Sequence, residues 1–517
     1  MSLRDRLSSR AWHDAWDVVI IGGGATGLGT AVEAASRGLR TLLLERGDFA
    51  QGTSSRSTKL VHGGVRYLEQ MNLALVTDAL RERGAMLRNA PHLVHALDFV
   101  VPLYSYAAIP YYGAGLKMYD WLSGSLSLGP SKWLSAGETV TSLPTVRREG
   151  LKGGILYRDG QFDDARYAVA LARTLEDLGG VALNYAEVTG LIERNGRLEG
   201  VNALELESGE RFEARASVVI NATGVFADEI FRMDPAKQEV SLARSQGSHL
   251  VLTRDFLPGT SALMVPKTED GRVLFAIPWH DHVVVGTTDE EVRQSSREPH
   301  ATEKEKTFLM RHIAQYLGRE VTATDVLSMW SGLRPLLRRG NAATSRLSRD
   351  HQVLRSPSGL ITIIGGKWTT YRKMGEDTID AVLRTGGLRA APSRTRELKL
   401  HGWTDRITHG SDAVYGSELT AVQALAGEDS TLKRPLHPAL PYRRYEVVWA
   451  ARHEHARTTE DVLARRTRAL FLNAAAAIEA ALDVSQLLAR ELGRDEAWRR
   501  RDFDAFLTIA DGYKFAG

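Results

Sequence analysis

A βαβ unit near the start of the chain constrains the fold more than any other feature of the sequence. Residues 17–21 form an apolar run typical of a buried strand, and Gly22, Gly24 and Gly27 follow in the G-x-G-x-x-G spacing. Apolar residues at helical spacing then continue to Gly38. The first glycine permits a tight turn, the second lets the backbone approach a pyrophosphate, and the third lets the helix pack closely on the strand. The pattern predicts a Rossmann-like sheet with a dinucleotide site.

An acidic residue after the second strand supports this prediction. Residues 41–44 are apolar, and Glu45 follows them about 20 residues beyond the glycines. A carboxylate at this place can accept hydrogen bonds from ribose hydroxyls, while the N-terminus of the helix holds the phosphates. A glycine-rich turn in some other βαβ unit is the alternative, and it leaves Glu45 unexplained.

The polar segment after this unit favours FAD over NAD, which the glycine motif alone does not separate. Clustered hydroxyls are followed by paired glycines. The hydroxyls can bond a pyrophosphate and a ribityl chain, and the glycines let the backbone approach a flat ring. An ordinary solvated loop rich in Ser and Thr is the alternative. From this segment we expect cofactor contacts by Thr53, Ser54, Ser55, Lys59, His62 and Gly63.

Composition excludes several classes of function. With 517 residues, of which 43% are hydrophobic and 25% charged, the chain is typical of soluble proteins with two or three domains. A net charge of only +3, without a dense basic tract, argues against a nucleic-acid partner. The absence of cysteine excludes disulfides, thiol nucleophiles and cysteine-ligated zinc or iron–sulfur clusters, and we expect no metal site.

The sequence has no feature of an exported or membrane-spanning protein. The first sixteen residues carry five charged side chains and no apolar core of signal-peptide length. No window approaches the ~18 apolar residues that are needed to span a bilayer. We therefore expect a cytoplasmic protein.

The α/β fold is predicted to be interleaved along the sequence. Strands expected over 217–224 and 360–364 return to the Rossmann-like sheet, whereas alternating runs at 272–279 and 282–289 predict an antiparallel sheet on the substrate side. We expect an FAD-dependent oxidoreductase domain over 17–386 and an α-helical C-terminal domain over 387–517, separated at the polar linker 390–397. Within the first domain, the FAD-binding parts are placed at about 17–90, 150–240 and 340–386, and the substrate parts at about 91–149 and 241–339.

A series of ordered blocks along nearly the whole chain resembles a known family. The blocks are TSSRSTKLVHGGVRYLE at 53–69, FDDAR at 162–166, NATG at 221–224, GSH at 247–249, IPWHD at 277–281, GTTD at 286–289, SGLRPL at 331–336, SRD at 348–350 and GGKWTTYRK at 365–373. Through them the chain resembles the FAD-dependent glycerol-3-phosphate dehydrogenases, within the larger group related to D-amino-acid oxidase. The C-terminal helical segments resemble the last domain of the same family.

The resemblance implies oxidation of sn-glycerol 3-phosphate to dihydroxyacetone phosphate, with FAD as the hydride acceptor and a quinone as the next electron acceptor. Two alternatives are enzymes: an oxidase that uses oxygen, and a relative that acts on another hydroxy acid or an amine. A third is a non-catalytic flavoprotein. Several cations directed at a phosphate weigh against an amine substrate.

Two of the 15 histidines are candidates for the catalytic base. Oxidation of a secondary alcohol requires removal of the hydroxyl proton as the hydride leaves, and histidine is the side chain that most often does this. His62 precedes the glycine pair expected near the ring, and His249 lies in the GSH block. Either can instead hydrogen-bond the substrate or the flavin, in which case a water or another group is the base.

A phosphorylated substrate needs fixed cations. Arginine presents a planar fork that matches phosphate oxygens, whereas lysine acts as a point charge. The resemblance places the counterparts of Arg66, Arg334, Arg349 and Lys367 around the substrate, and we add Tyr67 and His249 to this substrate set. Arg334 and Lys367 are also assigned to the catalytic set. Most other arginines are expected to be solvated.

The block GGKWTT predicts further contacts to the cofactor. Gly365 and Gly366 end a strand, and Thr369 or Thr370 is expected to cap the helix that follows. The N-terminus of that helix, together with Lys367, would favour an anionic reduced ring. The remaining cofactor contacts are assigned to Trp368, Thr369 and Gly224 and, from the resemblance, to Val188.

The remaining expectations concern partners. Transfer of electrons to a quinone implies peripheral attachment to an anionic membrane surface, on the inner face of the cell membrane. The segment of Trp12 and Trp16 and the arginine-rich C-terminal helices are the candidates for this contact. The sequence leaves the oligomeric state open, and a homodimer is one option.

Overall fold

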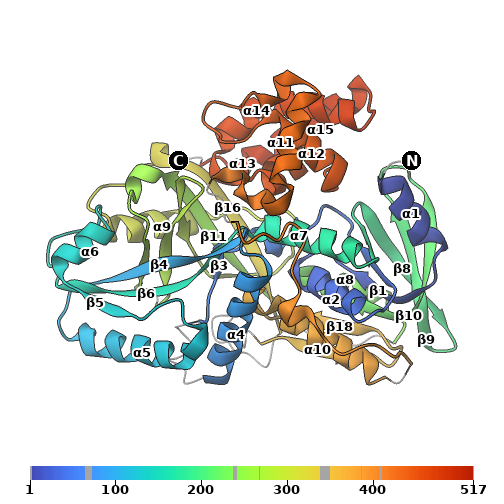
Figure 1. Cartoon of the computed structure of the whole chain (residues 1–517), viewed down its shortest axis with the longest axis horizontal. Coiled ribbons are helices and arrows are strands. Elements are labelled where there is room, and N and C mark those ends of the chain that lie inside the picture. The colour runs from blue at the N-terminus through green and yellow to red at the C-terminus, as the bar shows by residue number, and fades with distance from the viewer. Residues whose placement is uncertain are drawn as a thin grey trace.

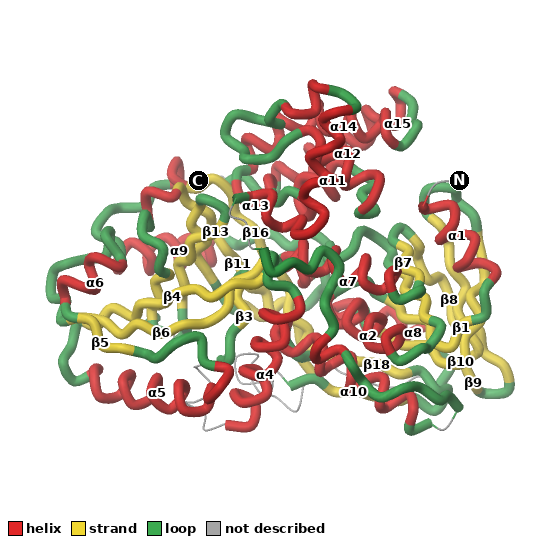
Figure 2. Tube along the Cα trace, in the orientation of Figure 1, coloured by secondary structure: helices red, strands yellow, loops and turns green. Residues whose placement is uncertain are grey.

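The structure, a computed structural model, contains two large sheets and a helical C-terminal region (Figures 1 and 2). It describes residues 3–64, 73–236, 242–266, 268–269, 271–337, 350–385, 387–406 and 410–515. The mixed α/β class and the helical C-terminal region agree with the sequence-based prediction.

The first sheet is the predicted Rossmann-like sheet, with the strand order β17-β18-β10-β1-β2-β7. Its strands are β1 (Trp16–Ile21), β2 (Thr41–Leu44), β7 (Val181–Leu183), β10 (Arg211–Asn221), β17 (Gln352–Arg355) and β18 (Ile361–Ile364). The five strands from β18 to β7 are parallel, and β17 is antiparallel to β18. The strands expected at 17–21, 41–44, 217–224 and 360–364 are therefore confirmed as neighbours in one sheet.

Alternation along β1 explains why this sheet is covered on both faces. Val18 and Ile20 face one core, and Val19 and Ile21 face the other. The first core is formed with the helices α2 (Ala25–Ser36), α7 (Asp164–Asp177) and α10 (Tyr371–Leu383). The second is formed with α1 (Leu3–His13), α8 (Ala227–Met233) and the hairpin β8 (Ala186–Arg194) and β9 (Arg197–Glu205), which extends from β10.

The second sheet has the strand order β15-β11-β14-β13-β12-β4-β6-β3, with β16 paired to β11 and β5 to β6. Its strands are β3 (Leu60–Val61), β4 (Val94–Leu103), β5 (Lys132–Leu134), β6 (Gly153–Phe162), β11 (Leu242–Thr253), β12 (Ala262–Val265), β13 (Leu274–Trp279), β14 (His282–Gly286), β15 (Glu290–Val292) and β16 (Val326–Leu337). The predicted antiparallel pair is confirmed as β13 and β14. The strand β6, from the segment expected on the cofactor side, also pairs in this sheet.

Helices from the middle of the chain and from its C-terminal region cover the second sheet. One of its faces packs on α6 (Ala136–Ser142) and α9 (Glu303–Tyr316), and α4 (Leu73–Asn89) and α5 (Ala108–Ser123) lie along its edge (Figure 1). The opposite face shares one continuous core with the C-terminal helices. Trp330 on β16 and Phe471 belong to that core, with their ring centroids 5.2 Å apart.

The C-terminal region consists of α11 (Leu419–Ala424), α12 (Arg444–His453), α13 (Ala469–Leu472), α14 (Ala474–Glu491) and α15 (Glu496–Asp511), drawn in orange and red in Figure 1. Asn473 caps α14, because its side chain accepts a hydrogen bond from the backbone N–H of Ala476. A π-helical turn, Asp461–Arg466, faces the first domain. Among the described residues, no helix is long and apolar enough to cross a bilayer.

Two local expectations from the sequence are wrong. Trp16 is buried in the core of the first sheet and is not available to a membrane, and the half-buried Trp12 packs on the ring of Phe212 at 5.7 Å. The N-cap of α10 is Thr370, but its side chain makes no cap hydrogen bond; its hydroxyl donates to the carbonyl of Lys367 instead.

Candidate active site

A large pocket opens at the carboxyl ends of the parallel strands. Ile21, Leu44, Ala222 and Gly365, which end or follow β1, β2, β10 and β18, line it together. Ligands of open α/β sheets bind at such an edge. Its free volume, including the space open to solvent, is about 1370 Å³. We call it the dinucleotide pocket. The predicted residues that line it are Gly22, Gly24, Glu45, Thr53, Ser54, Val188, Gly224, Gly365, Gly366, Lys367 and Trp368.

The three glycines of the motif each solve a steric problem. A Cβ on Gly22 would lie 2.7 Å from the carbonyl oxygen of Ala222, and Gly22 has a φ of 109°. A Cβ on Gly24 would lie 3.0 Å from the hydroxyl of Ser54, which also lines the pocket. Gly27 does not line the pocket; a Cβ there would lie 1.9 Å from the carbonyl oxygen of Gly22. Gly27 therefore lets α2 sit close to the turn, and the N-terminus of α2 opens into the pocket with Gly24, which has no side chain to cap it, as its N-cap residue.

Glu45 holds the two loops that frame the pocket. Its carboxylate accepts hydrogen bonds from the backbone N–H of Gly23 at 2.7 Å and of Gly47 at 2.8 Å. Burial raises the pKa of Glu45, while these two backbone bonds act in the opposite direction. Each carboxylate oxygen can accept a second hydrogen bond, so the residue can still bind ribose hydroxyls.

The hydroxyl-rich segment lies partly in the pocket and partly behind it. Ser54 accepts from the N–H of Ala25 at 2.9 Å, and Thr53 donates to the carbonyl of Leu333 at 2.6 Å. Ser55 is buried and does not line the pocket. The ammonium group of Lys59 is fully buried against Asp164 at 2.7 Å, with the ring of Trp330 4.6 Å from it. The charge of Lys59 is therefore held inside the protein, and Lys59 does not line the dinucleotide pocket.

The block after β18 forms the opposite wall. Gly365 and Gly366 both have positive φ, and a Cβ on Gly366 would lie 2.4 Å from the sulfur of Met374. Trp368 connects this wall to the hydroxyl-rich segment, because its indole N–H donates to the carbonyl of Ser54 at 2.8 Å. Lys367 lines the pocket beside it. Thr369 is buried behind this wall and accepts from the backbone N–H of His62 at 3.3 Å.

Other residues that line the pocket were not predicted. Arg297 and Met374 line it, as do Arg46 and Phe226, which stack with the guanidinium carbon 4.2 Å from the ring centroid. Only the NATG block, which ends just before Phe226, pointed to this region. No local pattern identified Arg297.

His62 directly follows β3, and the next residue, Gly63, is fixed by buried side chains. The N–H of Gly63 donates to the hydroxyl of Tyr119 at 3.0 Å, and that hydroxyl donates to Asp159 at 2.8 Å. Arg83 completes the buried group with a 2.9 Å bond to Asp159. A Cβ on Gly63 would lie 2.4 Å from the Tyr119 oxygen, so this position requires glycine. Gly63 itself does not line the pocket.

His249 lies on β11, almost fully buried. Its ring stacks on Trp330, and its Nε2 and the hydroxyl of Thr58 form a hydrogen bond of 2.9 Å. Burial, and then the charges of Lys59 and Arg334, lower the pKa of His249 well below its ordinary value. The imidazole is therefore neutral at physiological pH.

Arg334 lies on β16, the strand next to β11, and is oriented by the GTTD block. Its guanidinium donates to the hydroxyl of Thr287 at 3.1 Å and to the carbonyl of Thr288 at 3.4 Å. Its charge acts on His249, so the GSH, GTTD and SGLRPL blocks meet at one place. Trp279, an aromatic residue of the IPWHD block, is buried in the core shared with the C-terminal helices. Arg66, Tyr67 and Arg349 lie outside the described residues.

Family models and known proteins match this chain over almost its whole length. A model described as FAD dependent oxidoreductase matches residues 17–372, and one described as the C-terminal domain of alpha-glycerophosphate oxidase matches residues 361–499. A mitochondrial glycerol-3-phosphate dehydrogenase of Arabidopsis thaliana is 40% identical, covering 97% of this chain and 87% of that protein. The human mitochondrial glycerol-3-phosphate dehydrogenase is 39% identical, covering 96% of this chain and 74% of that protein.

Solved structures agree with these matches. The glycerol-3-phosphate dehydrogenase from Bacillus halodurans, complexed with FAD, has a TM-score of 0.81 and 29% identity, with 99% of this chain and 97% of that chain covered. An L-alpha-glycerophosphate oxidase from Mycoplasma pneumoniae shares the fold with a TM-score of 0.59 at 17% identity, covering 74% of this chain and 98% of that chain. The N-terminus of α2 at the pocket, the Glu45 carboxylate and the glycines of the motif fit FAD. The chain therefore belongs to the FAD-dependent glycerol-3-phosphate dehydrogenase family, with FAD as its cofactor.

Proposed function

We propose that the protein oxidises sn-glycerol 3-phosphate to dihydroxyacetone phosphate and passes the electrons to a quinone. One observation carries the proposal: the hydroxyl-rich segment, which contains Thr53 and Thr58, is bonded directly to the strands of the candidate substrate residues. Thr53, which lines the dinucleotide pocket, bonds the carbonyl of Leu333 beside Arg334, and Thr58 bonds His249. This junction supports a substrate site at the end of the cofactor that contains both a fixed cation and imidazole nitrogens.

The cation suits a phosphorylated substrate. Arg334 is oriented by Thr287 and Thr288, so its planar fork loses little freedom when it binds a phosphate. Lys367, on the other wall of the pocket, supplies a second positive charge. We propose that Arg66 and Arg349 complete the phosphate site, with Tyr67 beside them, as the family resemblance implies.

His62 and His249 have different proposed roles in the reaction. When bound, FAD accepts the hydride at its ring, so the protein must remove one proton from the substrate hydroxyl. The buried His249, beside two cations, is a poor proton acceptor, and we assign it to a hydrogen bond with the substrate oxygen. The half-buried His62 is the proposed base.

Anaerobic reduction of the flavin tests the substrate. Glycerol 3-phosphate should bleach the oxidised flavin absorbance of the purified holoenzyme, and glycerol at the same concentration should do so at least about a hundredfold more slowly, because it lacks the charged group that Arg334 binds. Equal bleaching by both compounds would contradict a phosphate site.

The electron acceptor is a separate part of the proposal. Turnover with a soluble quinone analogue should greatly exceed the formation of hydrogen peroxide in air. Peroxide formation at the full turnover rate would mean that the protein is an oxidase and not a dehydrogenase. The Mycoplasma pneumoniae protein of the same fold is named an oxidase.

We propose that the protein reaches a membrane quinone by peripheral attachment to the inner face of the cell membrane, through the surface around α5 and β5. Three large aromatic side chains are exposed there: Tyr106 just before α5, Trp121 near its end, and Trp133 on β5. Exposed lysines, Lys117 and Lys132, accompany them. Both elements lie beside β6 (Figure 1). Aromatic rings at headgroup depth with lysines beside them match an anionic lipid surface.

A further inference from the structure

Three arginines of the C-terminal domain are buried where that domain meets the segment 48–55, part of which lines the dinucleotide pocket. Arg465 and Arg466 end the π-helical turn, and Arg468 follows in the left-handed backbone region with a φ of 64°. The exposed fractions of the three residues are 1%, 2% and 1%. Charges taken out of water in this way require fixed partners. All three find partners in one segment of the first domain or directly beside it.

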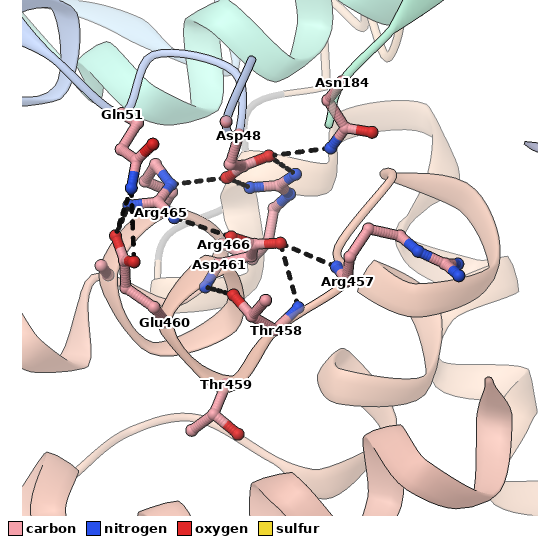
Figure 3. A network of polar contacts seen from close by, with 12 residues as sticks. Asp48, Gln51, Asn184, Arg457, Thr458, Thr459, Glu460, Asp461, Arg465 and Arg466 are labelled. Atoms are coloured by element: carbon pink, nitrogen blue, oxygen red, sulfur yellow. Dashed lines mark hydrogen bonds and ion pairs between the residues drawn. The ribbon is translucent and has the colours of Figure 1, made fainter. Parts of the chain in front are cut away.

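The first contact is with Asp48, at the start of that segment. Arg466 donates from its two terminal nitrogens to the two carboxylate oxygens of Asp48, at 2.7 and 2.8 Å, and Arg465 adds a bond from Nε (Figure 3). Asn184 donates to the same carboxylate at 3.3 Å. Burial alone would raise the pKa of Asp48, but the two guanidinium groups outweigh it and hold the pKa well below its ordinary range. A charged carboxylate is thus clamped between two arginines.

The second contact is with Ser55, at the other end of the segment. Arg468 donates to the carbonyl of Ser55 at 2.8 Å and to Asp164 at 3.2 Å. Lys59 donates to the same Ser55 carbonyl at 2.7 Å. In the middle, Gln51 donates to Glu460 at 3.3 Å (Figure 3). Residues 50–54, which lie between the two clamps, all line the dinucleotide pocket.

We propose that Arg465, Arg466 and Arg468 are positioning residues for FAD, through which the C-terminal domain holds the segment 48–55 in the shape that fits the cofactor. The domain thereby sets how tightly the enzyme retains FAD. Coupling between two sites is reciprocal, so bound FAD also stabilises the contact between the two domains. The proposal depends on the cofactor alone and is independent of the substrate.

A second buried ion pair supplies the control. Arg166 on α7 donates to the two oxygens of Glu454 at 2.7 and 2.6 Å, and both residues are as buried as Asp48 and its partners. This pair also joins the first domain to the C-terminal domain, but neither residue belongs to the segment 48–55, of which residues 50–54 line the dinucleotide pocket. Asp48→Asn and Glu454→Gln each replace one buried interdomain carboxylate by an amide of the same shape. A purely structural role of the interface predicts equal effects of the two substitutions.

The test measures the release of FAD from the holoenzyme by the rise of flavin fluorescence after dilution, together with the thermal unfolding midpoint and the visible circular dichroism of the bound flavin. In Asp48→Asn, FAD release should be at least about tenfold faster than in the parent, with a changed flavin dichroism. In Glu454→Gln, a lower unfolding midpoint should accompany a release rate within about twofold of the parent. Equal release from both variants, or no change in either, would overturn the proposal.

A milder substitution keeps the test decisive if Asp48→Asn does not fold. Arg466→Lys retains the charge and loses the bidentate contact with Asp48. Its FAD release should lie between those of the parent and Asp48→Asn, and added FAD should raise its unfolding midpoint less than that of the parent, because it binds FAD more weakly. If Arg466→Lys releases FAD at the rate of the parent and only its unfolding midpoint is lower, the contact between Arg466 and Asp48 serves stability alone, and the proposal is wrong.

Discussion

The imidazole ring of His249 lies nearly parallel to the indole ring of Trp330, with 4.1 Å between the ring centroids and 18° between the planes. The stack fixes the ring so that Nε2 reaches Thr58 in the cofactor segment. It also shields the imidazole from water. Burial and the nearby charges of Lys59 and Arg334 both disfavour protonation of the ring. A histidine held neutral in this way is suited to hydrogen bonding rather than to storing a proton.

The pH dependence of catalysis should therefore separate the two histidines. A base must be deprotonated to act, so the rate falls on the acid side of its pKa. In His62→Asn this acid limb of the kcat/KM profile should disappear and kcat should fall by about 10²–10⁴-fold. In His249→Asn the limb should remain while kcat/KM falls by about tenfold through a lost hydrogen bond. Loss of the acid limb in His249→Asn alone would reverse the assignment.

Glu45 should contribute to FAD affinity through the two loops that it joins. An amide cannot accept from both Gly23 and Gly47 and bind ribose as a carboxylate does, so Glu45→Gln should raise the FAD dissociation constant by about tenfold or more. Glu229→Gln is the matched control, because Glu229 also lines the pocket but, among the described residues, bonds only the side chain of Arg46. Titration of the apoprotein with FAD measures both constants. If the FAD dissociation constant rises equally in the two variants, the effect comes from the lost negative charge in the pocket and not from the two loops.

The close approach of α2 to the turn before it predicts a large difference between two glycine substitutions. In Gly27→Ala the new methyl group would lie 1.9 Å from the carbonyl oxygen of Gly22, so the helix must move away from the sheet. The free energy of unfolding should fall by about 3 kcal/mol or more, with loss of FAD binding. Gly137→Ala on α6 meets no atom within 4 Å, and it should leave stability unchanged or raise it by about 0.5–1 kcal/mol. Denaturant unfolding of both variants checks the comparison.

The sequence predicted best where one short pattern carries the whole signal. The glycine motif with its flanking apolar runs placed β1, α2 and β2, because local turn chemistry and periodicity suffice there. It also identified most of the glycines and hydroxyls around the pocket. The burial of Lys59 could not be predicted in this way, because composition does not reveal its left-handed backbone, with a φ of 63°, or its ion pair with Asp164.

The arginines of the C-terminal domain could not be predicted for a related reason. An arginine-rich helical pattern is typical of a solvated or lipid-facing surface, and the sequence predicts such a surface for the C-terminal helices. Their partner Asp48 lies 417 and 418 positions away, so no local pattern connects the charges. Burial of a charge is a property of the tertiary fold, and only the fold brings its counter-ion near.

Membrane attachment should depend on the exposed aromatic residues around α5 and β5. Trp121→Ala and Trp133→Ala should each weaken sedimentation with anionic vesicles by about threefold or more, and high salt should weaken it further by screening Lys117 and Lys132. Leu482→Ala on α14 is the control, because Leu482 is exposed to a similar degree as Trp133 but lies in the C-terminal domain. If Leu482→Ala lowers binding and the tryptophan variants do not, the membrane surface is on the C-terminal domain.

A histidine between the two domains should make stability depend on alkaline pH. The ring of His401 contacts Asp177 at 2.7 Å and Glu418 at 2.9 Å, with the charge of Arg173 opposing. Burial lowers the pKa of His401, but the bonds to the two carboxylates outweigh it and raise the pKa to about 9. Because the folded pKa lies above the unfolded one, the stabilisation is complete below about pH 6.5 and is lost as the pH rises through about 9. His401→Gln should therefore lower the free energy of unfolding by about 1–2 kcal/mol at pH 6 and much less at pH 9.5. Denaturant unfolding of the parent and the variant across this range measures the difference, and a difference that does not change with pH would mean that His401 acts by packing alone.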